Sequence, residues 1–365
     1  MRLKVPSLSV MASLVFYTLL VLPQGGVFAA APDPQTLKRL QETRNCAGCN
    51  LAAANLQSIY LEGANLSRAN LMNSSLKGAN LSGANLQGAN LKDSDLTGAD
   101  LRGTDLTGAN LQGANLKDTK ISDETGLGKK WRSSWEIMNQ TAAGKDLSNL
   151  DLRGVNLNHA DLTKVILEGA NLEGANLSSA KLPKASLNGI NLRNATLFMV
   201  DFSEAQLQKA DLRKADLRRA DLRSAVLSSA NLAEANLRNS LLKDADLSDA
   251  NLSGADLSSA DLTGTTLNGA TLSGVILRGA NLSNATLSGV NLRGLNLRGI
   301  ILQGADLKEA NLSGLNLSKL NLSGAKLNDA NLSNANLSGA DLSNANLSVA
   351  QKVSHWLYQC DLHSF

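Results

Sequence analysis

Residues 79–98 read ANLSG ANLQG ANLKD SDLTG, and this five-residue pattern decides the fold. Leucine occupies every fifth position from Leu51 to Leu116 and again from 147 to 347, where only Phe202 departs from it. The residue two positions before each repeat leucine is usually Ala, and we call this the inner position. The outer position between them is usually Asn or Asp. The two residues after the leucine are commonly Ser, Arg, Thr or Gly, and we call them the turn positions.

A period of five fits neither regular helix nor long strand. An α-helix turns once in about 3.6 residues, so leucines five apart would spread around its surface. A strand alternates its side chains with period 2, so successive leucines would face opposite sides. A short extended piece followed by a corner satisfies the pattern, with glycines such as Gly63 permitting the turn. The chain is therefore expected to be all-β, coiled into a solenoid that buries leucine and alanine columns.

The number of walls in one coil stays open from the residues alone. Bulky inner residues should stack on one another in adjacent coils. A spacing of 20 gives the pairs 275–295, 295–315 and 300–320, whereas a spacing of 15 gives 150–165, 275–290 and 300–315.

Units such as ANLSG at 79–83 and ADLRK at 210–214 resemble the pentapeptide-repeat family. The resemblance implies a right-handed, quadrilateral β-helix with twenty residues per coil, in two blocks at 46–121 and 147–350. Lys129-Lys130-Trp131-Arg132 is similar to an insertion in family members from cyanobacteria.

The first 29 residues are typical of a secretory signal. Arg2 and Lys4 precede an apolar run at 10–22, and Val27-Phe28-Ala29 suits cleavage. We expect an exported protein without stable membrane insertion after cleavage; an uncleaved anchor is the alternative. With a cyanobacterial origin, the destination is the periplasm or the thylakoid lumen.

Both ends of the solenoid are expected to be capped. Segment 30–45 holds a short helix from Asp33 to Arg44, with Asp33 as its cap. Segment 351–365 contains Trp356 and Tyr358 and is interpreted as a closing cap. The rival interpretation is an end-to-end homodimer surface made by these two aromatic residues.

Residues 122–146 interrupt the repeat and predict an amphipathic helix. Trp131, Trp135, Met138 and Ala142 share one helical face, and Gly144 is expected to end it. One interpretation is a helix braced against the outside of the solenoid. The other is a partner-docking site formed by Trp131, Trp135 and Met138.

Cys46 and Cys49 form a CxxC pair, which the register places at a leucine position and the next inner position. In an exported protein we expect a structural disulfide between them. Thioredoxin-like chemistry at this pair is an alternative, as is a metal site at His355, Cys360 and His363.

The charge of the mature chain argues against nucleic-acid binding. The full chain has 35 Lys and Arg against 32 Asp and Glu, and two of the cations lie in the signal segment. Carboxylates at outer positions share one kind of environment, which disfavours acid–base catalysis. A belt of cations interleaved with acids is interpreted as a solvated surface: Lys209, Arg213, Lys214, Arg218, Arg219 and Arg223.

The sequence thus predicts a non-enzymatic scaffold that has an unidentified protein partner and no cofactor or metal. Two alternatives remain. One is a DNA mimic that occupies topoisomerases, as the family resemblance suggests, although the near-neutral charge and the export signal disfavour it. The other is a redox or metal protein centred on the cysteines.

Overall fold

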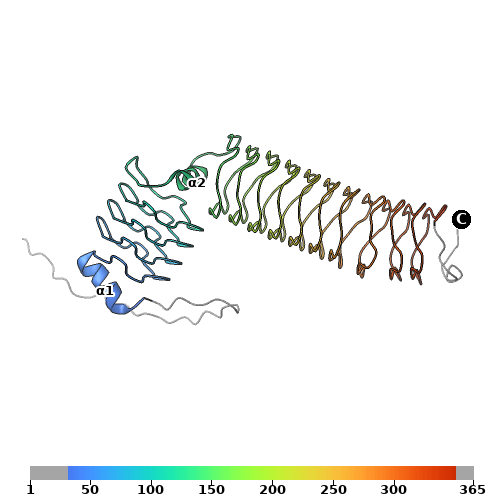
Figure 1. Cartoon of the computed structure of the whole chain (residues 1–365), viewed down its shortest axis with the longest axis horizontal. Helices are drawn as coiled ribbons and strands as arrows, with labels where there is room; N and C mark the ends of the chain where they lie inside the picture. Colours follow the sequence, from blue (N-terminus) through green and yellow to red (C-terminus); the bar gives the residue numbers. More distant parts are fainter. Residues whose placement is uncertain (1–31, 351–365) are drawn as a thin grey trace, which may run out of the picture.

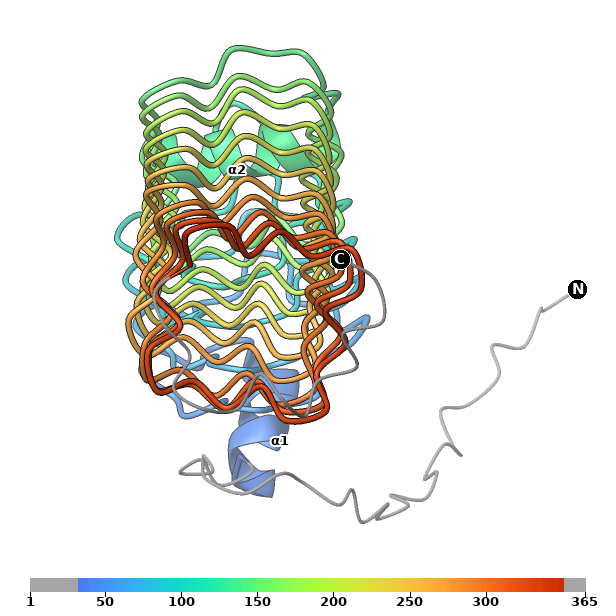
Figure 2. The same ribbon diagram turned by 90° about the vertical axis from the view of Figure 1, so that its right-hand side faces the viewer.

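A computed structural model of the chain describes residues 32–350. In that range every β-bridge is parallel and joins a residue to the one twenty positions later, as between Asn65 and Asn85. Twenty residues hold four five-residue units, so each coil has four walls. The four-sided β-helix implied by the family resemblance is therefore confirmed, and the three-walled alternative is wrong. Figure 2 shows the stacked coils from the end of the rod.

Each five-residue unit folds as the alternation of its side chains requires. The inner residue and the repeat leucine are buried, as in Ala84 and Leu86, while outer residues face solvent. The Ala84 N–H closes a turn by donating to the Leu81 carbonyl oxygen at 2.9 Å. The second turn position has a positive φ whether it is Gly83 (65°) or Lys214 (59°). Glycine there avoids a steric cost that other residues incur.

The outer Asn or Asp stabilises the next corner. Its side-chain oxygen accepts the main-chain N–H two residues on, as Asn80 Oδ1 does from Ser82 at 3.0 Å. The Ser82 hydroxyl donates to the same oxygen at 2.7 Å. This local bond explains why short amides and carboxylates recur at the outer position.

Main-chain hydrogen bonds join consecutive coils. The Leu81 N–H donates to the Asp100 carbonyl oxygen at 2.8 Å, and the Lys120 N–H donates to that of Ala99 at 2.9 Å. Each coil therefore depends on the next to satisfy its N–H and C=O groups.

Helix α1, Pro34–Thr43, covers the open end of the first coil. Asp33 caps it, since its side chain accepts the Gln35 N–H at 3.2 Å. Leu40 is fully buried and packs into the first hydrophobic core.

Two hydrophobic cores divide the rod, one in each block, and the rod bends where they meet (Figure 1). Helix α2, Lys129–Asn139, lies at this bend. It is the second of two helices in the described range. Neither is long and apolar enough to cross a bilayer.

The structure corrects two expectations for this helix. It ends at Asn139 rather than near Gly144, because the Asn139 side chain folds back onto the Trp135 carbonyl oxygen and Gln140 is extended. It also lies between the two cores rather than on the outside of the solenoid. As a result its fully buried side chains are Ser134 and Ile137, while Trp131 is half-buried.

Candidate interaction site at the junction of the two blocks

Helix α2 and the residues just after it contact both blocks, and Trp131 packs against both cores. Trp131 and Trp135 pack against the first core. Ile137 and Ala142 belong to the second core, against which Trp131 and Met138 also pack. The three residues predicted to dock a partner thus lie together at the junction, and all three are half-buried by the protein itself.

The insertion supplies the hydrogen bonds that a further coil would have made. Without the insertion, the last coil of the first block would end with unpaired main-chain groups, a costly situation for a buried strand edge. The Trp135 indole N–H donates to the Thr119 carbonyl oxygen at 3.0 Å, and the Gly126 N–H donates to that of Thr104 at 2.9 Å. Asn139 Oδ1 accepts the Asp118 N–H at 2.5 Å.

One wall passes directly from the first block to the second. The Gly113 N–H donates to the Gly154 carbonyl oxygen at 2.8 Å, and Asn156 Nδ2 donates to that of Gly113 at 3.2 Å. These residues are 41 or more positions apart in the sequence, so the insertion loops out of an otherwise continuous wall. Sequence reasoning missed this contact and the role of Asn139. The only available signal was the length of the insertion, close to one coil.

A shallow groove of about 420 Å³ opens at the junction, lined by residues of both blocks and of α2. Lys130 Nζ lies 4.3 Å from the centre of the Trp131 ring and donates to the Arg153 carbonyl oxygen at 3.2 Å. Such cation–π contacts hold an aromatic face and a charge side by side. Glu173, Gln112, Asn110 and Asn194 add to the polar lining.

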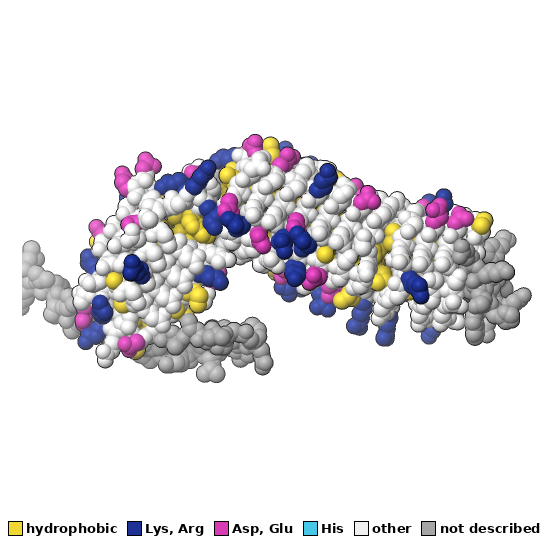
Figure 3. Space-filling view, viewed as in Figure 1, with side chains coloured by type: hydrophobic (Ala, Val, Ile, Leu, Met, Phe, Trp, Pro, Cys, Tyr) yellow, Lys and Arg dark blue, Asp and Glu magenta, His cyan; other side chains and the backbone are white. Residues whose placement is uncertain are grey.

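Arg153 has a carboxylate partner at the edge of this groove. Its Nε and Nη2 donate to the two oxygens of Asp151 at 2.9 and 2.8 Å. Hydrogen bonding and charge from Arg153 lower the pKa of Asp151 to about 2, so this carboxylate stays ionised. Basic and acidic side chains alternate around the bend on the face drawn in Figure 3. The groove therefore offers an aromatic face with both signs of charge.

Three of the six cations in the basic belt of the second block are paired within their own repeat. Arg213, Arg218 and Arg223 each bind the carboxylate two residues earlier, through two side-chain nitrogens. Hydrogen bonds from Arg218 lower the pKa of Asp216. These Asp-Leu-Arg units are self-contained ion pairs on the rod surface, as the interpretation of a solvated belt predicted.

The two cysteines lie in the first coil beneath α1. Their sulfur atoms are 2.04 Å apart, at bonding distance. Cys46 is fully buried and Cys49 is half-buried. Trp356, Tyr358, His355, Cys360 and His363 lie outside the described residues, as does the signal segment. No group of three or more His, Cys, Asp or Glu within residues 32–350 is placed to hold a metal.

Comparison with known proteins identifies the repeat. None of the curated proteins matches the chain. The family model for pentapeptide repeats (8 copies) matches overlapping segments over most of the chain: 49–88, 84–123, 139–169, 170–197, 201–239, 230–269, 240–279, 255–294, 267–304, 291–329 and 316–350. Residues 124–138, which contain nearly all of α2, fall outside every matched segment.

Three solved structures illustrate the similarity. HetL, a pentapeptide repeat protein involved in heterocyst differentiation regulation in the cyanobacterium Nostoc sp. strain PCC 7120, is 37% identical over 55% of this chain and 88% of its own, with a TM-score of 0.31. A pentapeptide repeat protein from the Arabidopsis thaliana thylakoid lumen is 32% identical over 32% of this chain and 68% of its own, with a TM-score of 0.15. QnrB1, a plasmid-mediated fluoroquinolone resistance protein, is 20% identical over 56% of this chain and 92% of its own, with a TM-score of 0.43.

The matched segments of the family model, the leucine register and the coil of twenty residues agree. The chain belongs to the pentapeptide-repeat family.

Proposed function

We propose that this protein is an exported, non-enzymatic scaffold that binds a protein partner at the junction of its two blocks. The proposal rests on the position of α2 between the two blocks. The insertion closes one block, joins it to the next, and still leaves the face of Trp131 beside Lys130 and Arg153 at the surface.

The surface of the rod supports a structural role. Outer carboxylates are engaged by their own repeat, as Asp216 is by Arg218 and Asp151 by Arg153. Lowered pKa values keep both carboxylates ionised, whereas a general acid at neutral pH needs a raised pKa. Long, regular solenoids offer extended surfaces for partners.

The docking role is proposed for Trp131 with Lys130 and Arg153, and not equally for all three predicted residues. The Trp135 indole N–H is engaged by Thr119, and Met138 packs against the second core. We propose that these two residues position the helix. Aromatic and arginine side chains at a groove are typical anchors of protein interfaces.

Export rests on the signal at residues 1–29. Mass spectrometry of the protein purified from its host tests it, because cleavage after Ala29 leaves a chain that begins with Ala30. Protease protection of intact cells and isolated thylakoids then separates the periplasm from the lumen. An intact Met1 in the mature protein would overturn the export proposal.

Crosslinking capture from the exported fraction tests the partner site. Tagged wild type is compared with Lys130→Ser/Arg153→Ser, which alters the surface of the groove, and with Trp135→Phe, which alters only an internal bond. We expect one crosslinked protein to be lost with the first variant and kept with the second. Loss with Trp135→Phe alone, or equal capture by all three, would contradict a docking site in the groove.

The double variant Trp131→Ala/Trp135→Ala serves as a positive control for loss. It removes the aromatic face and also opens the junction, so it cannot by itself distinguish contact from folding. Far-ultraviolet circular dichroism on each variant shows whether the coil structure is retained.

A further inference from the structure

The coil-to-coil ladder breaks around one unit of the second block. Over most of the block it is regular, as between Leu317 N–H and the Asn336 carbonyl oxygen at 2.8 Å, but the pairing of Thr271 with Asn291 just before this unit is missing too. Within the described part of the chain, the unit 295–299 makes no such bond to the coil after it, and the only one to the coil before it is a long bond from the Gly279 N–H to the Arg298 carbonyl oxygen at 3.4 Å. Its own turn persists, because the Ile300 N–H still donates to the Leu297 carbonyl oxygen at 3.3 Å. The unit thus keeps its fold but stands apart from its neighbours.

Bulky inner side chains account for the separation. The inner position is usually Ala, but Val275, Leu295 and Leu315 stack there on one wall, and Ile300 and Leu320 stack on the next. Extra methylene groups in a filled core displace the backbone. These are the three pairs at a spacing of 20 found in the sequence. Leu295 is accordingly half-buried, whereas inner residues elsewhere in the middle of this block are buried.

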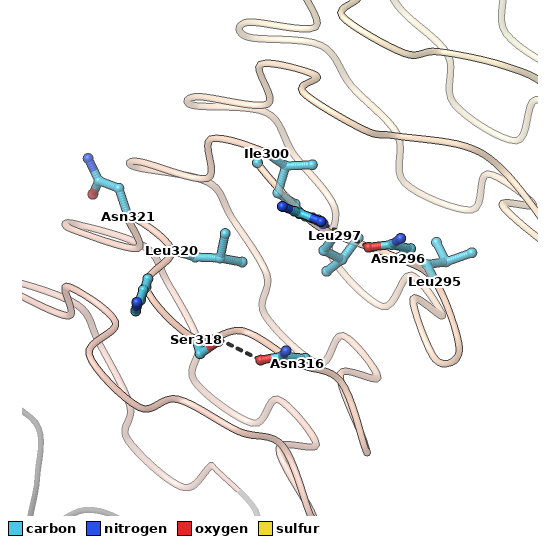
Figure 4. Close-up of a pocket in the computed structure, with 11 residues that line it drawn as sticks. Leu295, Asn296, Leu297, Ile300, Asn316, Ser318, Leu320 and Asn321 are labelled. Carbon is cyan, nitrogen blue, oxygen red and sulfur yellow. Dashed lines mark hydrogen bonds between the residues drawn. The ribbon is translucent and has the colours of Figure 1, made fainter.

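The separation leaves a cavity of about 760 Å³, which we call the coil gap. Residues 295–300 line one side, and Asn316 with residues 318–321 line the other. Ligand pockets commonly enclose about 300–1,000 Å³. Figure 4 shows Leu320 and Leu297 directed into the space between the two chain segments, with the Ser318–Asn316 hydrogen bond beside it.

Both edges of the coil gap present free main-chain groups. The N–H groups of Leu297 and Gly299 on one edge, and of Asn316 and Asn321 on the other, make no hydrogen bond within residues 32–350. The carbonyl oxygens of Leu295, Ile300, Asn316 and Ser318, which normally pair across the coils, are also free there. Unpaired strand edges are templates for an added strand.

Charge and apolar surface define what would fit. Arg298 and Lys319 line the coil gap, no carboxylate lines it, and neither cation forms an ion pair within the described range. Two outer positions nearby hold isoleucine instead of Asn or Asp. Ile276 is 49% exposed and Ile301 is 42% exposed. The occupant therefore needs an extended main chain with both acidic and apolar side chains.

We propose that the coil gap binds an extended acidic peptide segment as an added β-strand. The peptide main chain pairs with the free groups of Leu297 and Asn316. Its carboxylates lie against Arg298 and Lys319, and its apolar side chains contact Ile301 and neighbouring leucines. This site is separate from the junction groove and does not depend on the function proposed there.

Fluorescence anisotropy with the whole mature protein tests the proposal. The probe is a labelled octapeptide of alternating valine and glutamate with blocked ends. One comparison peptide alternates valine and lysine, and another carries N-methyl groups on alternate residues of the acidic sequence. We expect the acidic peptide to bind at least about tenfold more tightly than either. Equal affinity for the acidic and basic peptides, or no binding at all, would overturn the proposal.

Two variants locate the binding. Leu295→Ala/Ile300→Ala restores the usual inner residue, so the ladder should close and the affinity should fall about tenfold or more while the protein stays folded. Arg298→Ser/Lys319→Gly installs the residues found one coil later and should weaken acidic-peptide binding similarly. The matched control, Lys209→Gly/Arg219→Gly, removes two cations where the ladder is intact and should bind as wild type does. Wild-type affinity in the first variant would overturn the proposal.

Discussion

The indole N–H of Trp135 donates to the carbonyl oxygen of Thr119 at 3.0 Å. In the preceding coil the equivalent acceptor, the Ala99 carbonyl oxygen, is bonded by the main-chain N–H of Lys120. A single side chain therefore replaces one bond of a missing coil. The insertion is accordingly a cap for the first block as well as a connection to the second.

Trp135→Phe should destabilise the first block by about 1–3 kcal/mol, since it leaves the Thr119 carbonyl oxygen without its partner while keeping aromatic bulk. Hydrogen exchange of amides in residues 100–120 measures the loss as faster exchange. Trp131→Phe is the matched control, because the Trp131 indole makes no hydrogen bond within the described chain. Equal acceleration by both substitutions would contradict this role for the bond.

Phe202 is the one aromatic residue in the leucine register, and it is fully buried. Phe202→Ala should cost about 3–5 kcal/mol through the cavity it leaves. Phe202→Leu restores the repeat residue and should cost less than about 1.5 kcal/mol. Urea unfolding of the two variants checks the difference. A leucine variant as unstable as the alanine variant would mean that neighbouring coils have adapted to the ring.

Much of the fold could be predicted because the residues within each five-residue unit determine how that unit folds. Leu81 and Ala84 are inward-facing by alternation, and the turn between them needs a permissive second turn position. The cap formed by Asp33 was equally local. The number of walls per coil could not be predicted from single units, since spacings of 15 and 20 both give stacked bulky residues. Only the pairing between coils decides between them.

The candidate sites were harder to predict for the same reason. The face shared by Trp131, Trp135 and Met138 was visible from helical spacing, but two cores on opposite sides of α2 determine which side chains are covered. The coil gap illustrates the reverse case. The sequence indicates that Leu295 and Ile300 stack on bulky residues of the next coil, yet only the three-dimensional crowding shows that they disrupt the ladder.

The CxxC pair is predicted to be a structural disulfide. Thiol titration of the denatured, unreduced mature protein should find one free cysteine, Cys360, among the three in the chain. Three free thiols would contradict the prediction. The chain-entropy relation gives so short a loop about 2 kcal/mol of stabilisation, so reduction should loosen the first coil and α1 rather than unfold the rod.

Acid should weaken the Asp151–Arg153 pair over a defined range. The pKa of Asp151 is lowered from 3.8 to about 2, chiefly by hydrogen bonding from Arg153. A lowered folded-state pKa stabilises the protein above the unfolded value, and this contribution is lost as the pH falls from about 4 toward 2. Both side chains are exposed, so solvent screening keeps the contribution small.

Carboxyl NMR titration measures the Asp151 pKa directly. In Arg153→Ser it should return toward the ordinary value, whereas Arg293→Ser, made far from the junction, should leave it unchanged. A low pKa that survives removal of Arg153 would assign the effect to Lys130 or to the main chain instead.

The DNA-mimic alternative predicts inhibition of gyrase-catalysed supercoiling, which near-neutral charge should prevent. A protein that occupies a DNA-binding groove must present a strongly acidic surface, because the groove is basic and attraction between exposed charges decides encounter. The chain instead has 35 Lys and Arg against 32 Asp and Glu, and five of the carboxylates are paired with arginines of their own repeat. A supercoiling assay with the mature protein should therefore show no inhibition at low micromolar concentration.

Replacing Arg213, Arg218 and Arg223 with serine frees three carboxylates, and inhibition that appeared only in this variant would confirm that charge is the deciding factor. Inhibition by the wild-type protein would contradict that argument and restore the alternative.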